Sequence, residues 1–256
     1  MNEKERPTQL TNAGFVEYYP QIQYIRDRII GNAVSGMIKG WDRNGKILVP
    51  GCGNGGTMID LNMKFFPFSS IYGIDVNIDA LRGTRMKENR LGLADIGEMP
   101  FLPKTFDYAV ISDVIQDWDD YKVLVTRLKE IARVVKNKGQ VLVTNPTAKS
   151  YLTETILFDC LYQGNEGAVK VGMGAEVKGK LKSLDRSGKI IKHDFIDYVW
   201  RDSDLERAFL EAGLKRLRKA RPKARDDSRR PEWIGVHDWI SETRTAPWVV
   251  YLLEVK

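Results

Sequence analysis

The sequence predicts an α/β fold in which helices cover an open, doubly wound sheet of mostly parallel strands. Short apolar runs alternate with amphipathic segments over residues 46–145, as they do in successive βαβ units. The first run, "KILVP" at 46–50, leads into a glycine-rich loop and then a helical pattern. The 256 residues are 43% hydrophobic and 29% charged. This is an ordinary globular balance, with room for one α/β domain with an insertion or two small domains.

The elements up to residue 145 follow from hydrophobic periodicity. Residues 16–38 have apolar positions at helical spacing after Pro20 and predict one or two N-terminal helices. Strands are expected at 46–50, 70–75, 92–95, 106–112 and 140–145. Helices are expected between them at 57–66, 77–90 and 119–139. The last helix should be capped by Asp119 or Asp120 and end at Gly139.

After residue 146 the pattern changes. A helix is expected at 150–164, followed by a β-rich, hairpin-like insertion at about 164–200. A further helix at 202–214 precedes two closing strands near 214–220 and at 248–255, which are compatible with an antiparallel edge on the sheet. We therefore expect an N-terminal helical cap or lid over 1–40 and one main domain over 41–256.

Composition argues against several classes of protein. No run of about 18 apolar residues exists, so a membrane span is not expected. The polar N-terminus lacks a signal region, which predicts a cytoplasmic location. Two cysteines and two histidines are too few for a disulfide scaffold or a histidine-rich metal site. No metal is therefore expected.

The net charge of +6 is concentrated in part of the chain. Residues 214–230 contain nine Lys or Arg against two Asp. Such a run is either a solvated face or a basic rim that attracts an anionic substrate or RNA. The run contains no aromatic residue on which bases could stack, so nucleic acid is the less favoured ligand.

The loop "GCGNGG" fits two cofactor motifs. Gly51, Gly53 and Gly56 spell the G-x-G-x-x-G of dinucleotide-binding proteins. Residues 51–55 also spell the G-x-G-x-G of enzymes that hold S-adenosylmethionine. Asp75, at the end of the second expected strand, could hold ribose hydroxyls in both cases. The loop and Asp75 thus predict an adenosine-containing cofactor without deciding which.

The segment 93–120 distinguishes between a dinucleotide and S-adenosylmethionine as the cofactor. No tyrosine is followed four residues later by lysine, so the short-chain dehydrogenase pair is missing. Asp95 ends the third expected strand, and "FDYAVIS" at 106–112 forms the fourth. With the glycine loop, these motifs resemble a class I S-adenosylmethionine-dependent methyltransferase of the small-molecule branch, over roughly residues 46–145. The resemblance implies a seven-stranded Rossmann-like sheet.

The resemblance also implies a role for individual residues. Those expected to bind S-adenosylmethionine are Gly51, Cys52, Gly53, Asn54, Asp75, Val76, Asp95, Ile96 and Ser112. Asp117 and Tyr19 are the candidates for catalysis, and the candidates for substrate contact are Tyr18, Tyr24, Asp113 and Trp118. The tyrosines and Trp118 have helix or core packing as their alternative. The sequence departs from the family pattern in having Val49 in place of an acidic residue and Gln116-Asp117 in place of a histidine pair.

The expected function is methyl transfer from S-adenosylmethionine to a small-molecule O, N or C nucleophile by in-line displacement, with proximity and orientation dominant. The acceptor could be anionic, and a homodimer is left open. Two alternatives stay open: an RNA methyltransferase that uses residues 214–230, and a non-catalytic cofactor-binding protein. A dehydrogenase is the most distant option.

Overall fold

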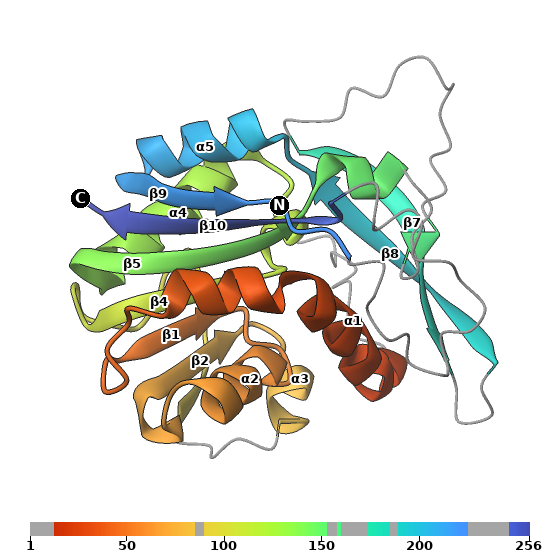
Figure 1. The fold of residues 1–256 in the computed structure, drawn as a ribbon, viewed down its shortest axis with the longest axis horizontal. Coiled ribbons are helices and arrows are strands. Elements are labelled where there is room, and N and C mark those ends of the chain that lie inside the picture. The colour runs from red at the N-terminus through yellow and green to blue at the C-terminus, as the bar shows by residue number, and fades with distance from the viewer. Residues whose placement is uncertain (1–12, 85–89, 153–157, 160–173, 185–188, 225–245) are drawn as a thin grey trace, which may run out of the picture.

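The computed structural model describes residues 13–84, 90–152, 158–159, 174–184, 189–224 and 246–256. Its main feature is a seven-stranded sheet with strand order β3-β2-β1-β4-β5-β10-β9 (Figure 1). The strands are β1 (Ile47–Pro50), β2 (Ile71–Asp75), β3 (Leu91–Leu93), β4 (Phe106–Ser112), β5 (Val135–Pro146), β9 (Leu214–Ala220) and β10 (Trp248–Val255). The predicted doubly wound, mostly parallel α/β sheet is confirmed.

Helices cover both faces of this sheet. They are α1 (Ala13–Ile38), α2 (Gly56–Lys64), α3 (Ile78–Arg82), α4 (Tyr121–Val134) and α5 (Asp202–Glu211), with 3-10 turns η1 (Phe68–Ser70), η3 (Ile115–Asp117) and η4 (Ala148–Leu152). One buried cluster joins α1, α2 and α3 to one face, and a second joins α4 and α5 to the other. This two-faced covering explains why the strands read as continuous apolar runs.

The antiparallel strand β10 is not at the edge of the sheet. It pairs with β5 on one side, from Trp248 opposite Pro146 to Glu254 opposite Gln140, and with β9 on the other. The edge is β9, whose residues from Lys215 to Arg218 are exposed. The sequence predicted both closing strands, but it did not predict that the last strand, β10, lies between β5 and β9.

The insertion forms a second, three-stranded antiparallel sheet, β6 (Phe158–Asp159), β7 (Ala175–Leu184) and β8 (Ile190–Val199). It lies beyond the carboxyl ends of the parallel strands (Figure 1). The predicted β-rich hairpin corresponds to β7 and β8. The predicted helix over 150–164 is wrong where the structure describes it, because 148–152 form a 3-10 turn and Phe158 pairs with Leu181 of β7. Residues 153–157 and 160–164 lie outside the described part.

Two predicted helix ends are also corrected. Asp120 caps α4 by accepting hydrogen bonds from the backbone N–H groups of Lys122 and Val123, as expected. The helix ends at Val134, however, because Val135 already pairs with Phe106 of β4. Gly139 therefore lies inside β5, where a Cβ would come within 2.7 Å of the Asp107 carbonyl oxygen. The helix expected at 77–90 ends at Arg82, and residues 85–89 are outside the described part.

The N-terminal segment forms one helix, α1, which runs through Pro20. Its second half is part of the main core: Ile29, Ile30, Met37 and Ile38 are buried with residues of β1, β4, β5 and β10. The helix thus belongs to the packing of the sheet at one end, while its other end extends past the carboxyl edge (Figure 1). A lid function for residues 1–40 stays a prediction.

Candidate functional site

The glycine loop connects β1 to α2 and has a backbone that only glycine adopts easily. Gly51, Gly53 and Gly55 have φ values of 68°, 53° and 85°. A Cβ on Gly51 would lie 2.7 Å from a methyl carbon of Val114, whereas a Cβ on Gly53 would meet nothing within 4 Å. Gly51 is therefore required for packing, and Gly53 leaves an open backbone surface that a ligand can approach.

Replacement of Gly51 by alanine is expected to lower the free energy of unfolding by about 2–4 kcal/mol, because a left-handed residue with a Cβ is strained and this Cβ overlaps Val114. Gly36→Ala is the matched control: it lies in α1, has nothing within 4 Å of its added Cβ, and should gain about 0.5–1 kcal/mol. Chemical denaturation measures both. Equal stability of Gly51→Ala and the parent would contradict the assigned backbone conformation.

Asp75 holds the loop in place from the end of β2. One carboxylate oxygen accepts the backbone N–H of Gly53 at 2.7 Å, and the other accepts that of Asn77 at 2.8 Å. Asp75 is only partly buried, and each carboxylate oxygen can accept a second hydrogen bond. The group can therefore receive two hydroxyl donors. It lies one strand from the point between β1 and β4 where the strand order reverses, and open α/β sheets bind nucleosides at such a point. The residues present thus fit the ribose of an adenosine cofactor.

The residues that follow β2 and β3 could surround the adenine ring of the cofactor. Val76 is 58% exposed although it is apolar. Asp95 follows β3, accepts the backbone N–H of Gly97 at 2.6 Å and lies 3.5 Å from Arg127. Ile96 is buried. Because β2 and β3 are adjacent and in register, the structure brings Val76 and Asp95 to the same edge of the sheet.

Two residues of the loop have contacts within the protein. The Cys52 side chain is buried against Gly73, and burial raises the pKa of its thiol to about 12. A contact with the cofactor would have to come from the backbone of this residue. Asn54 accepts the backbone N–H of Gly56 at 3.4 Å, at the start of α2. Val49, at the position where the family has an acidic residue, is 1% exposed and part of the core.

Sequence reasoning missed Arg26, which links α1 to the end of β4. Its guanidinium donates to the Ser112 hydroxyl at 2.7 Å and to the Asp113 carboxylate at 2.9 Å, and it lies 3.8 Å from Asp60 of α2. Arg26 is 5% exposed. Its signal in the sequence was a cation inside an apolar helical stripe, but such a residue usually extends to solvent, so the pattern gave no reason to choose it.

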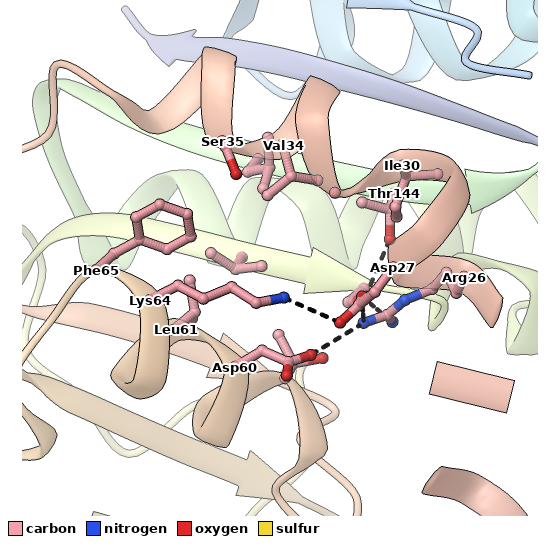
Figure 2. A pocket seen from close by; sticks show the side chains of 15 residues that line it. Arg26, Asp27, Ile30, Val34, Ser35, Asp60, Leu61, Lys64, Phe65 and Thr144 are labelled. Carbon is pink, nitrogen blue, oxygen red and sulfur yellow. Dashed lines mark hydrogen bonds and ion pairs between the residues drawn. The ribbon is translucent and has the colours of Figure 1, made fainter. Parts of the chain in front are cut away.

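A pocket lies beside this network, between α1, α2 and the ends of β4 and β5 (Figure 2). Its apolar wall includes Ile30, Leu61 and Phe65, and its polar part includes Asp27 and Lys64, whose carboxylate and ammonium groups are 3.1 Å apart. Ser112 and Thr144 also line it, with their hydroxyl oxygens 3.1 Å apart. Ser112 is thus occupied by Arg26 and Thr144 in this conformation.

The two substrate candidates after β4 have structural partners. Asp113 has a φ of 53° and accepts hydrogen bonds from Arg26 and from the indole N–H of Trp248. Desolvation raises the pKa of its carboxyl, and Arg26 opposes that shift. Trp118 is 2% exposed, and its carbonyl oxygen accepts the indole N–H of Trp200. This burial fits the packing alternative for Trp118 better than a substrate contact.

Asp117 is the last residue of η3. Desolvation raises the pKa of its carboxyl well above the ordinary value, and the charges of Asp197, Asp75 and Asp113 act in the same direction. Asp117 is exposed to solvent, so water weakens both the desolvation and the interactions with these three charges. Arg127 opposes the shift. Tyr18, Tyr19 and Tyr24 belong to α1, but their side chains lie outside the described part.

Asp197 is the second residue that the sequence did not reveal. It belongs to β8 of the insertion, is 8% exposed and accepts the hydroxyl of Tyr151 at 2.7 Å. Desolvation and the charge of Asp113 raise the pKa of its carboxyl to about 7, against the hydrogen bond from Tyr151. Alternation along β8 could have placed Asp197 on the inner face, but not its neighbours on other elements.

The Asp197→Asn variant is expected to gain stability relative to the parent as the pH rises. The folded pKa of about 7 is above the ordinary 3.8, so the folded parent retains a proton that the unfolded chain releases, and its stability falls between these pH values. Asparagine removes this penalty, which is on the order of a few kcal/mol, and still accepts the Tyr151 hydroxyl. Denaturant titrations from acid to neutral pH measure the difference. A difference that does not change with pH would contradict the raised pKa.

Comparison with known proteins agrees with this geometry. A family model described as a methyltransferase domain matches residues 42–193, more than half of the chain. An uncharacterized protein of Methanocaldococcus jannaschii, MJ0638, is 29% identical over 146 residues, which are 57% of this chain and 61% of that protein. The chain therefore spans less than two thirds of that relative.

Solved structures show the same fold at low identity. An S-adenosylmethionine-dependent methyltransferase from Clostridium acetobutylicum has a TM-score of 0.60 at 14% identity, covering 93% of this chain and 98% of its own. A Haloferax volcanii methyltransferase in complex with the activator Trm112 has a TM-score of 0.60 at 14% identity, covering 94% and 95%. The chain belongs to the methyltransferase domain family. Its fold is that of class I S-adenosylmethionine-dependent methyltransferases, as the sequence predicted.

Within the described residues, two further expectations can be compared with the structure. No helix there is both long and apolar enough to cross a membrane. No three His, Cys, Asp or Glu side chains of that part are grouped so that they could hold a metal ion. The domain boundaries and the roles of single residues stay predictions.

Proposed function

We propose that the chain transfers the methyl group of S-adenosylmethionine to a small-molecule nucleophile. The observation that carries the proposal is the pair of hydrogen bonds by which Asp75 fixes Gly53 and Asn77, because it sets a nucleoside-binding carboxylate beside an open glycine loop. Family membership supplies the reaction class. When bound, S-adenosylmethionine supplies an activated methyl group on a sulfonium.

The protein's own contribution is to orient the acceptor and to exclude water. The carboxyl ends of β1, β2 and β4 converge at one edge of the sheet, where the glycine loop, Asp75 and Ser112 lie. The sheet of β7 and β8 stands beyond this edge and would form the other wall (Figure 1). Asp117, which is exposed at the end of η3, is the candidate for accepting a proton from the acceptor. Water exclusion and alignment are enough for transfer from an activated donor to a neutral nucleophile.

The RNA alternative is less well supported by the basic segment. Most of the described part of the basic segment 214–230 lies on β9, at the edge of the sheet. Strands β10, β5 and β4 separate it from β1. Several of its cations are already paired with acids of α5: Arg216 with Glu206, Lys219 with Asp202 and Glu206, and Arg221 with Asp202. Paired cations far from the site favour a solvated structural edge.

Calorimetric titration tests the proposal directly. We expect S-adenosylmethionine and S-adenosylhomocysteine to bind with one-to-one stoichiometry. We also expect S-adenosylhomocysteine to form when the protein is incubated with a pool of small metabolites, but not with total RNA, at low and at moderate salt. Failure to bind either compound would overturn the proposal. Turnover with RNA alone, lost as salt is added, would establish the alternative.

A further inference from the structure

The direction in which the cofactor extends from Asp75 follows from the order of the strands. The residues expected beside the adenine, Val76 and Asp95, follow β2 and β3, whereas β1 and β4 lie on the other side of β2. The methionine portion of S-adenosylmethionine leaves the ribose opposite the base, so it should run past the end of β1 toward β4. Val114, just after β4, packs against the glycine loop, because a Cβ on Gly51 would lie 2.7 Å from one of its methyl carbons. The loop and the end of β4 therefore lie side by side.

The methionine portion ends in a carboxylate and an ammonium group on one carbon atom. A cation and an anion that lie close together are the side chains best suited to bind both groups. The glycine loop supplies neither, since residues 51–56 contain no charged side chain. Val49, at the position of the family's acidic residue, is apolar and 1% exposed. Charged partners therefore have to come from elements that pack beside the loop.

A cation on α1 and an anion on α2 lie in the pocket between these two helices. The Nη2 atom of Arg26 is 3.8 Å from a carboxylate oxygen of Asp60, and both side chains line the pocket (Figure 2). Thr57, in the first turn of α2, and Ser112, at the end of β4, line the same pocket. Because Thr57 directly follows the glycine loop, this end of the pocket is where the methionine portion would arrive.

The guanidinium of Arg26 is held at this position by one of its nitrogen atoms. Nη1 donates to the Ser112 hydroxyl at 2.7 Å and to the Asp113 carboxylate at 2.9 Å. Nη2 lies 3.4 Å from Asp27 and 3.8 Å from Asp60, and both distances are longer than the roughly 2.7–2.9 Å of a short charge-assisted hydrogen bond. A guanidinium has five N–H donors in a fixed fork. Nη2 can therefore bind an incoming carboxylate while Nη1 keeps its present bonds.

The balance of charge around Arg26 favours a ligand that carries both signs. The carboxylates of Asp27, Asp60 and Asp113 lie 2.9–3.8 Å from its guanidinium, and Lys64 is paired with Asp27 at 3.1 Å. Among these five groups negative charge is in excess, so a simple anion would be repelled. A zwitterion adds no net charge. A buried ionic network contributes little stability over apolar packing, so a binding role also explains why Arg26 is a buried cation.

We propose that Arg26 binds the carboxylate of the methionine portion of S-adenosylmethionine and that Asp60 binds its ammonium group. This assignment rests on the proposed function. Asp113 does not touch the cofactor and is a positioning residue, which fixes Nη1 of Arg26. Helix α1 then contributes to cofactor binding as well as to packing on the sheet.

The test measures the dissociation constants of four probes for the full chain by calorimetry. The probes are S-adenosylhomocysteine, its analogue without the carboxylate, its analogue without the amino group, and methylthioadenosine, which lacks both. The parent is expected to bind S-adenosylhomocysteine at least about tenfold more tightly than either analogue, and to bind methylthioadenosine most weakly.

Each variant should affect only the probes that carry its partner group. Arg26→Gln should weaken S-adenosylhomocysteine binding about tenfold and change the affinity for the analogue without the carboxylate by less than about twofold. Asp60→Asn should weaken S-adenosylhomocysteine binding about tenfold and leave the analogue without the amino group within about twofold. Asp60 is partly accessible, so its variant should fold even if Arg26→Gln does not. The comparison of the four probes on the parent needs no variant.

Lys64→Gln serves as the control, because it removes a cation that lines the same pocket but is paired with Asp27. Its affinity for each probe should stay within about twofold of that of the parent. Methylthioadenosine that binds the parent as tightly as S-adenosylhomocysteine, or an Asp60→Asn variant that binds S-adenosylhomocysteine as the parent does, overturns the assignment and leaves the proposed function standing. Failure of S-adenosylhomocysteine to bind the parent overturns the proposed function, and the assignment with it.

Discussion

Replacement of Arg26 by methionine is expected to lower the free energy of unfolding by about 3–5 kcal/mol, because it removes one partner of a buried ionic network. The guanidinium of Arg26 is the donor to both Ser112 and Asp113. Without it, the indole of Trp248 is the described donor left to the Asp113 carboxylate. Denaturant unfolding followed by circular dichroism gives the change.

Lys39→Met is the matched control, since Lys39 directly follows the same helix and is exposed. Its effect should be within about 0.5 kcal/mol of zero. The double variant Arg26→Met with Asp113→Asn should lose less than the sum of the two single losses, because the second change removes the unpaired charge that the first leaves behind. Strict additivity would show that the two side chains do not depend on each other.

Replacement of Asp75 by alanine is expected to weaken S-adenosylmethionine binding by about 30- to 200-fold, or 2–3 kcal/mol, near the upper end for loss of charge-assisted hydrogen bonds. The effect should be large for two reasons. The variant loses the acceptors for ribose hydroxyls, and it frees the N–H groups of Gly53 and Asn77 that keep the loop in its binding shape. Titration calorimetry measures the dissociation constant.

Asp79→Ala serves as the control, because Asp79 is an exposed acid on the following helix that forms an ion pair with Arg82. Its cofactor affinity should equal that of the parent within about twofold. Asp75→Asn retains one acceptor oxygen and should fall between the parent and alanine. If Asp75→Ala bound the cofactor normally, the ribose would have to lie elsewhere and the strand-two assignment would be wrong.

Local patterns predicted most of the parallel sheet. The apolar runs that form β1, β2 and β4 are largely buried, so their hydrophobic composition alone predicted strands inside the sheet. Asp120 worked as a helix cap because capping depends on residues close in sequence. The prediction that Gly139 ends this helix was wrong for the opposite reason. Gly139 lies in β5, where the close approach of Asp107 from β4, far from it in sequence, leaves no room for a Cβ.

The candidate site also contains residues that local patterns predicted and residues that they did not. Gly51, Gly53 and Asp75 could be found because loop, strand end and helix are consecutive in one βαβ unit. Arg26 and Asp197 could not, since each acts on residues more than forty positions away: Arg26 on Ser112, and Asp197 on Tyr151. Such contacts depend on how α1 and the insertion pack on the sheet, and local patterns in a single sequence do not predict that packing.

The position of β10 between β5 and β9 has a consequence for biosynthesis. The ribosome delivers β9 before β10, its one neighbour in the sheet, so both hydrogen-bonding edges of the nascent β9 are open. Open edges invite pairing with other nascent chains, and positive charge is a common protection against it. The lysines and arginines of 215–219 can thus keep an unfinished chain from aggregating until its final strand arrives.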